Sequence, residues 1–161
     1  MSTIYYYAKN ESLPIFLKYG IRLSKNFDKE YNLNGYLKPY LVGLLNPRDD
    51  EKKYSSDDYT CLKLDVLDIH LNVIDGSIPL EENVVKEFKP IDKYFFGSYI
   101  KPRVLIDTSI ISDKISVYNK FIDIPLLYNN SEEFYYQVQI EKIIDKYPPI
   151  DIYKCLKEKF E

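Results

Sequence analysis

Residues 136–141 read Tyr-Gln-Val-Gln-Ile-Glu, a regular alternation of apolar and polar side chains. Successive side chains of a β-strand point to opposite faces, so the alternation predicts a strand over residues 136–141. Gln137, Gln139 and Glu141 would share one face of that strand, with two amides and one carboxylate in a row. We interpret this polar face as the floor of a ligand-binding cleft.

Other familiar catalytic patterns are absent from the chain. It contains no P-loop, GxGxxG, GxSxG or HExxH motif, and its five glycines argue against a glycine-rich phosphate cradle. The single histidine, His70, falls on a predicted strand, where a structural or surface role is favoured over a catalytic base. Asp57 and Asp58 could bind a metal ion, but adjacent acids in a loop are more often solvated, so no metal is expected.

The charge balance limits the class of partner. A formal net charge of -3 argues against a broad nucleic-acid surface, because affinity for a phosphate backbone comes mainly from Lys and Arg. Arginine is the better bidentate reader of phosphate, so Arg22, Arg48 and Arg103 are the first candidates for an anion site. Each could equally be a solvated surface charge. The 17 tyrosines reflect either compositional bias or a functional aromatic surface.

The length of 161 residues suits a single domain over residues 1–161, large enough to bury a core without disulfides. The apolar runs, such as residues 40–45, are far shorter than the roughly 18 residues that cross a bilayer. No signal peptide is evident at the N-terminus. We therefore expect a cytoplasmic protein without a membrane partner, in which Cys61 and Cys155 are reduced thiols.

The hydrophobic patterns predict an α/β or α+β domain. Strands are predicted at residues 3–8, 40–45, 59–66, 69–74 and 103–107, with a further short strand around 115–118. Residues 21–24 are expected to be extended, and residues 26–38 irregular with a turn at Asn34-Gly35.

Three helices are predicted. The first follows Pro14, takes an N-cap oxygen from Asn10 or Ser12, and stops at Gly20. Its buried face is expected to contain Ile15, Phe16 and Tyr19. The second helix covers residues 79–88, with an apolar stripe of Leu80, Val84 and Phe88. The third follows Pro148-Pro149, near the C-terminus.

Two segments of the chain share a pattern. Residues 104–107 read Val-x-Ile-Asp, and residues 138–141 read Val-x-Ile-Glu. Each is followed by an isoleucine and later by a short Ile-x-(Val/Ile)-Tyr run, with a spacing that differs by one residue. The segments are either two strand–loop units of similar structure or a chance similarity in a chain rich in Ile and Tyr.

Both ends of the chain resemble a known family. Residues 5–24 read Y-Y-Y-A-x4-L-P-I-F-L-x2-G-I-x2-S, which resembles the opening of the DNA ADP-ribosyltransferase toxin group. There a strand with a histidine leads into an N-L-P-x-I-L-x-x-G-L helix. Residues 134–140, followed by residues 148–150, are similar to that group's R-x-A-E-V-L-V…P-x-x-x-I segment, and residues 40–47 resemble its intervening strand.

The resemblance implies an α+β fold with a mixed or antiparallel split sheet, a few short helices and a cleft for NAD or an ADP-ribosyl ligand. The family's histidine falls near Tyr6 or Tyr7, and its catalytic glutamate aligns with Gln137 or Gln139. Glu141, two residues further along the same strand face, is the candidate catalytic carboxylate only if the register differs. A neutral amide lacks the negative charge that stabilises an oxocarbenium-like centre, so the domain would be divergent or inactive. The implied ligand-binding residues are Tyr5 and Tyr7 for stacking, Arg22 or Arg48 for the pyrophosphate, Ser24 for ribose, and Gln137, Gln139 and Glu141 on the ribose side.

Two other functions fit the same residues. Small size, acidic charge and many tyrosines are typical of a non-catalytic protein-binding module, such as an immunity, antitoxin or phage-encoded inhibitor protein. An exposed contiguous patch of tyrosines, with no concave pocket, would support that function. An endoribonuclease of a toxin system is a third hypothesis, against which the single histidine and the acidic charge count. The NAD hypothesis predicts that residues 3–8 and 136–141 line one cleft, and their placement on opposite sides of the domain would reject it.

Overall fold

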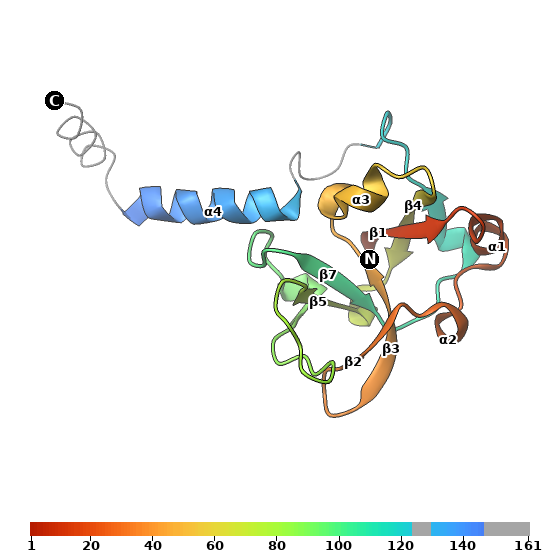
Figure 1. Ribbon diagram of the computed structural model, residues 1–161, viewed down its shortest axis with the longest axis horizontal. Helices are drawn as coiled ribbons and strands as arrows, with labels where there is room; N and C mark the ends of the chain where they lie inside the picture. Colours follow the sequence, from red (N-terminus) through yellow and green to blue (C-terminus); the bar gives the residue numbers. More distant parts are fainter. Residues whose placement is uncertain (124–129, 147–161) are drawn as a thin grey trace.

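The computed structural model describes residues 1–123 and 130–146, which form an α+β fold with two antiparallel sheets and few helices (Figure 1). The smaller sheet has the strand order β1-β4-β8, and the larger has the order β2-β3-β7-β5-β6. The strands are β1 Ser2–Lys9, β2 Lys29–Asn32, β3 Leu37–Gly43, β4 Tyr59–Val66, β5 Leu71–Asp75, β6 Lys89–Pro90, β7 Pro102–Ile106 and β8 Ile115–Val117.

The described helices are short except for the last. The α-helices are α1 Leu13–Tyr19, α2 Leu23–Asn26, α3 Glu51–Tyr54 and α4 Ser131–Lys146. Single 3-10 turns occur at η1 Pro47–Asp49, η2 Asp68–His70, η3 Ile91–Lys93 and η4 Ser112–Lys114. No helix in the described ranges is both long and apolar enough to cross a membrane.

The smaller sheet follows directly from alternation in the sequence. β1 pairs antiparallel with β4 along its whole length, with Ile4 opposite Leu64 and Tyr6 opposite Leu62. These inward side chains are buried, whereas Tyr5, between them, is half-buried on the outer face. The strands predicted at residues 3–8, 59–66 and near 115 are therefore confirmed.

The main core lies between the two sheets. Ile4 and Leu64 from the smaller sheet pack in one cluster with Leu41, Val104 and Ile106 from the larger sheet, and all five are fully buried. A backbone bridge between Tyr5 and Leu44 also joins β1 to the chain that leaves β3. Complete burial of one aliphatic side chain contributes about 1.5–3 kcal/mol, so this cluster is the principal stabilising contact of the fold.

The far face of the larger sheet carries a second, smaller core of Tyr31, Tyr40, Ile74, Val85 and Leu105. β7 lies between β3 and β5, so Leu105 faces this second core while its neighbours in sequence face the main core. A strand covered on both sides needs consecutive apolar residues, as residues 104–106 provide. The predicted strands at residues 40–45 and 103–107 are confirmed, and the strand expected at residues 69–74 begins at Leu71, after η2.

The first helix is confirmed with two corrections. α1 ends at Gly20, whose φ of 82° suits glycine, and a Cβ there would lie 2.3 Å from the backbone oxygen of Ile110. Ser12 makes no side-chain cap, so the predicted N-cap oxygen is wrong. Of the predicted buried face only Phe16 is buried, because α1 touches the body along one narrow side and leaves Ile15 and Tyr19 in solvent.

The helix predicted over residues 79–88 is wrong. Glu82 and Asn83 have φ values of 52° and 58°, which a right-handed helix excludes. The backbone of this segment pairs instead with β2, since Asn32 donates to the oxygen of Asn83 and accepts from the nitrogen of Val85. Val85 anchors the segment in the second core, so the apolar pattern serves packing against the sheet rather than a helix.

Residues 21–38 also differ in part from prediction. Residues 23–26 form the helical turn α2 rather than an extended segment, and residues 29–32, expected to be irregular, form β2. Tyr31 is the reason for the strand, because its ring is buried against Tyr40 of the neighbouring β3. The predicted turn at Asn34-Gly35 is present, with Gly35 at a φ of 91°.

The strand predicted over residues 136–141 is wrong, because these residues lie within α4. The start of this helix is held by side chains: the Asn130 amide oxygen accepts from the nitrogen of Glu133, and the Asp49 carboxylate accepts from both the nitrogen and the hydroxyl of Ser131. These bonds satisfy amides that a helix start leaves unpaired. α4 then extends away from both sheets, with no strand edge beside it (Figure 1).

The remaining predictions near the C-terminus lie outside the described residues. They are the helix after Pro148-Pro149, the thiol of Cys155, and the Ile-x-Ile-Tyr run at residues 150–153 of the shared pattern. The first copy of that pattern, residues 104–118, forms β7 and β8, whereas residues 138–141 of the second copy lie in α4, so the two are not strand–loop units of similar structure.

Candidate functional site

The residues predicted to line one NAD cleft are spread over the molecule. Tyr5 and Tyr7 lie on the outer face of the smaller sheet, and Arg22 and Ser24 are exposed at α2. α2 and α4 lie on opposite sides of the body, so the α2 residues are remote from the residues on α4 (Figure 1). The structure brings Tyr5 and Tyr7 together, and Arg48 directly follows Pro47, whose backbone oxygen accepts from the Tyr7 hydroxyl. It does not bring the α2 residues to them.

The three polar residues of the predicted cleft floor no longer share a face. Side chains two positions apart on a helix do not face each other, so Gln139 points away from Gln137 and Glu141. Gln137 and Glu141, four positions apart, share an exposed side of α4. Arg48, in η1, forms a 3.6 Å ion pair with Glu51.

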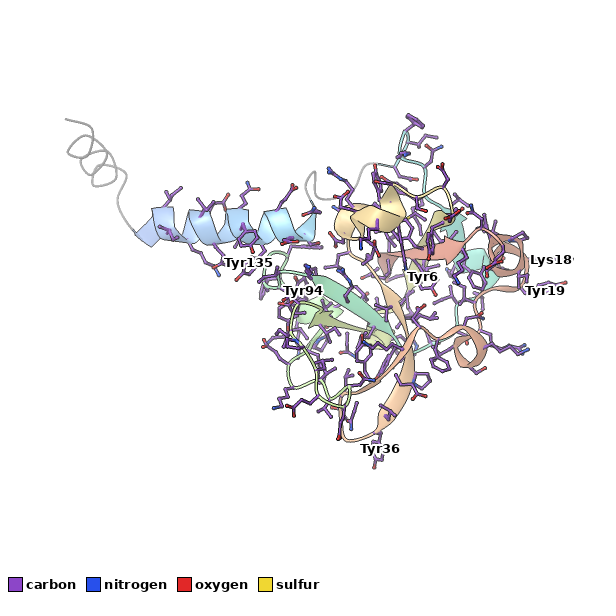
Figure 2. All side chains as sticks on the ribbon, in the orientation of Figure 1. Tyr6, Lys18, Tyr19, Tyr36, Tyr94 and Tyr135 are labelled. Carbon is purple, nitrogen blue, oxygen red and sulfur yellow. The ribbon has the colours of Figure 1, made fainter. Side chains whose placement is uncertain are left out.

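Tyr6 and Tyr7, the two tyrosines at the family's histidine position, have different environments. Tyr6 points into the body (Figure 2), where its hydroxyl donates to Asp28 Oδ1 at 3.1 Å. Burial raises the pKa of Tyr6 far above its ordinary range, with the Asp28 charge adding to the effect. Tyr7 lies on the outer face and donates to the backbone oxygen of Pro47. Tyr7 is therefore the one available to a ligand.

Two hollows flank these outer tyrosines. The first, of about 570 Å³, is lined by the rings of Tyr5, Tyr94 and Phe96, together with the 2.7 Å ion pair between Lys63 and Asp123. Tyr94 reaches this region from the larger sheet's side of the body (Figure 2). An aromatic wall beside a paired cation and anion suits a flat, partly polar group.

The second hollow, of about 350 Å³, is lined by Tyr7, Tyr54 and Tyr118 and by two lysines. Lys120 Nζ lies 5.2 Å from the ring centroid of Tyr54, a cation–π distance. Tyr118 packs edge-to-face on Tyr5 at 5.6 Å, so it forms the partition between the two hollows.

Cys61 lines the second hollow as a neutral thiol. Burial raises its pKa to about 12, and the hydrogen bond with Tyr7 opposes that rise only in part. The thiolate is the nucleophilic form, so Cys61 is unsuited to covalent catalysis at neutral pH.

A wider hollow, of about 930 Å³, opens over the second core and is lined by residues 74–75, 78–82 and 84–87. We call it the acidic groove. Ile74 and Val85 form its floor, and Ile78 and Val84 keep 50% and 37% of their surface exposed. The groove was missed at the sequence level because its wall, residues 79–88, has the spacing of an amphipathic helix.

The rim of the groove is negatively charged. Glu81, Glu82 and Glu87 are exposed there, and Lys86 is the sole cation among the described lining residues. Asp75 has a structural role: its carboxylate accepts from the nitrogens of Ile100 and Lys101 and from Ser77. Burial alone would raise the pKa of Asp75, but these hydrogen bonds hold it below its ordinary range.

The remaining candidates do not form a centre for catalysis or metal binding. His70 Nδ1 lies 2.8 Å from Asp107 Oδ1 on a partly exposed surface, a pairing between residues 37 positions apart that no sequence pattern indicated. Among residues 1–123 and 130–146, no group of three or more His, Cys, Asp or Glu side chains could hold a metal ion. Asp57 and Asp58 instead take part in the turn before β4.

Within residues 1–123 and 130–146, the two most exposed tyrosines do not lie in one patch. Tyr19 and Tyr36, each 73% exposed, project at separate edges of the body (Figure 2). No protein-family model, curated protein or solved structure matches the chain. The functional argument therefore rests on the acidic groove and on the outer face of the smaller sheet.

Proposed function

We propose that the protein is a non-catalytic protein-binding module of the immunity, antitoxin or inhibitor kind, whose acidic groove receives a basic, partly apolar segment of its partner. The observation that carries the proposal is the groove itself, an apolar floor under a rim of three exposed glutamates. Side chains of a partner that cover Ile78 and Val84 remove exposed apolar surface from water, at about 25 cal/mol per Å².

The negative charge of the rim determines which side chains of a partner can bind there. Glu81, Glu82 and Glu87 favour Lys or Arg on the segment that binds and disfavour acidic competitors. Such exposed charges act mainly on the rate of association and weaken with added salt, whereas the apolar floor acts on the lifetime of the complex. A partner segment of this kind alternates cationic and aliphatic residues.

A calorimetric titration tests the proposal, with a synthetic peptide of alternating leucine and lysine as the probe and its leucine–glutamate counterpart as the control peptide. The double variant Glu81→Lys, Glu87→Lys is expected to bind the basic probe about tenfold more weakly or worse. The matched control is Glu11→Lys, Asp65→Lys, which makes the same charge change at exposed sites outside the groove. Equal weakening by both double variants would mean non-specific attraction and would reject the groove.

A second candidate is an ADP-ribosyltransferase-like domain that binds NAD or an ADP-ribosyl ligand without catalysis. The arrangement in two antiparallel sheets agrees with the split sheet that the family resemblance implies. Tyr5 and Tyr7, roughly 6.8 Å apart along β1, line adjoining hollows of a size that suits the two halves of a dinucleotide. Lys63 and Lys120 supply cations near the partition, while Glu141 lies on α4, away from this face.

Thermal-shift titration with NAD, ADP-ribose and nicotinamide tests this candidate, because a ligand that binds only the folded state raises its apparent stability. The shift is expected to disappear in Tyr5→Ala and to persist in Tyr36→Ala, which removes an equally large ring from a remote edge. Absence of any shift with millimolar ligand would remove the NAD hypothesis and leave the acidic groove unaffected.

A further inference from the structure

The second hollow, on the outer side of the smaller sheet, has two walls that are held by hydrogen bonds. One wall is α3, which is capped at its start because the nitrogen of Lys53 donates to the Asp50 carboxylate at 3.1 Å. This cap fixes the backbone that carries Lys53 and Tyr54, and both side chains line the hollow.

The other wall is the loop that follows β8. The Asp123 carboxylate accepts from the nitrogen of Asn119 at 2.7 Å and from the ammonium group of Lys63 at 2.7 Å. The side chain of Asn119 in turn accepts from the nitrogen of Phe121. These bonds hold the loop in one turn, so a fixed backbone presents Lys120 to the hollow.

Each lysine of the second hollow lies against a tyrosine ring. Lys120 Nζ is 5.2 Å from the ring centroid of Tyr54, and Lys53 Nζ is 5.1 Å from that of Tyr59. Within residues 1–123 and 130–146, neither lysine forms an ion pair with a carboxylate. An ammonium group has three donors and the ring face covers one side of it, so both lysines keep donors for a ligand.

The second hollow has more positive charge than the first hollow or the acidic groove. Asp57 is the single acid among its described lining residues, and that side chain is exposed. In the first hollow the charge of Lys63 is balanced by Asp123, and the rim of the acidic groove carries three glutamates. The second hollow is therefore a cationic site in a chain whose formal net charge is -3.

The rings beside these lysines suit a flat group. Tyr7 and Tyr118 line the same hollow, and both are partly exposed. Burial raises the pKa of Tyr118 above its ordinary range, so its hydroxyl is neutral and does not repel an anion. A volume of about 350 Å³ is that of a small-molecule site.

We propose that the second hollow binds a phosphate monoester carried on a flat aromatic ring. Lys53 and Lys120 hold the phosphate, and the ring lies against Tyr7 and Tyr118. Lysine binds phosphate as a point charge, and a monoester carries a charge of about −1.5 to −2 at pH 7. The pyrophosphate of a dinucleotide has less charge per phosphorus, so two lysines favour the monoester.

This site is separate from the acidic groove, and it differs from the NAD candidate in two respects. NAD would occupy both hollows that flank Tyr118, whereas the monoester needs only the second. NAD also lacks the doubly charged phosphate that the two lysines select. The two ligands can therefore be distinguished by direct comparison.

Isothermal titration calorimetry of the full chain with phenyl phosphate tests the site. Lys120→Met and Lys53→Met are each expected to weaken binding about tenfold, the effect of losing one charged hydrogen bond. Lys18→Met is the matched control, because Lys18 Nζ lies 5.2 Å from the Tyr19 ring in a similar contact away from the hollow (Figure 2). Lys120 and Lys18 are both exposed, so thermal unfolding should show that both variants fold.

The charge and the ring of the probe are tested separately. Methyl phenyl phosphate keeps the ring and loses one negative charge, and it is expected to bind about tenfold more weakly. Tyr118→Leu is expected to weaken phenyl phosphate about fivefold and to weaken methyl phosphate, which has no ring, by less.

Three results would overturn the proposal. They are the absence of binding at millimolar phenyl phosphate, equal weakening by Lys18→Met and Lys120→Met, and tighter binding of NAD than of phenyl phosphate. The last result would favour the dinucleotide candidate. None of them affects the peptide titration that tests the acidic groove, because the two sites share no lining residue.

Discussion

β7 and α4 carry the same local pattern and fold into different structures. Residues 104–107 and 138–141 share a Val-x-Ile-acid pattern, yet the first forms part of a central strand and the second a surface helix. The strand has hydrogen-bonding neighbours on both sides, since β7 pairs with β3 and with β5. The helix satisfies its own backbone and needs only its first turn to be held.

A carboxylate organises the start of each segment. Asp75 accepts from the nitrogens of Ile100 and Lys101, directly before β7, and Asp49 accepts from Ser131 at the start of α4. Asp75 itself belongs to β5, the neighbour of β7, whereas Asp49 belongs to the 3-10 turn η1. The comparison shows that alternating apolar and polar residues form the two faces of a strand only where a neighbouring strand is available to pair with the segment.

The largest contrast is expected between core and surface isoleucines of the two segments. Ile106→Ala in β7 removes a fully buried side chain and should reduce the free energy of unfolding by about 2–5 kcal/mol. Ile143→Ala in α4 should change it by only about 0.5 kcal/mol, since the side chain is 57% exposed. Urea unfolding at low micromolar protein measures both, and equal losses would mean that α4 is part of the core.

Gly97 tests the contact between α4 and the body. Gly97→Ala is unfavourable for two reasons: the backbone has a φ of 88°, and the added Cβ would collide with Val138. Gly35→Ala meets only the first, because its φ is 91° and nothing lies within 4 Å of its Cβ. We expect about 1 kcal/mol of destabilisation at Gly35 and a larger loss at Gly97, with faster amide exchange in α4. Identical losses would show that α4 does not pack on this glycine.

The start of α4 should be sensitive to its cap. Ser131→Ala removes the hydroxyl that donates to Asp49, and we expect a loss of about 1 kcal/mol in helix stability. Hydrogen exchange is the appropriate measurement, since the loss should appear in the amides of α4 and leave those of β7 unchanged. Ser116→Ala, on an exposed position of β8, serves as the control. Slower exchange in β7 than in α4 before any substitution is also expected.

The smallest effect is a difference in pH dependence between the two carboxylates. The pKa of Asp75 is lowered, so its ionised form stabilises the fold above the unfolded-state pKa, and this contribution is lost as pH falls through the folded-state value. The pKa of Asp49 is raised, chiefly by burial, although the hydrogen bonds from Ser131 oppose the rise. Its contribution is therefore full below the unfolded-state pKa and lost as pH rises through the folded-state value.

Two variants separate these contributions. The stability difference between the parent chain and Asp75→Asn should shrink as the pH is lowered from neutral into the acidic range. The difference between the parent chain and Asp49→Asn should grow over the same range. Parallel trends in the two titrations would contradict the opposite shifts of the two pKa values.

Much of the sheet framework could be predicted from the sequence. Alternation located β1 and β4, a continuous apolar run located β7, and the pair Pro14 and Gly20 located α1. These features are local, because the side-chain period of a strand and the conformation of proline and glycine depend on neighbouring residues alone. Three consecutive tyrosines conceal which of them face outward, so the outward placement of Tyr5 and Tyr7 came from the structure.

Only the tertiary structure decided the nature of residues 79–88 and 131–146. Val85 and its neighbours have helical spacing but bond to Asn32, and Gln137 and Gln139 alternate like a strand but lie on a helix started by Asp49. The acidic groove arises from the first of these segments, and the exposed apolar side of α4 arises from the second. The spacing of apolar residues indicates which side chains can share a face. Whether the segment becomes a helix or a strand depends on hydrogen-bonding and packing partners that are distant in sequence.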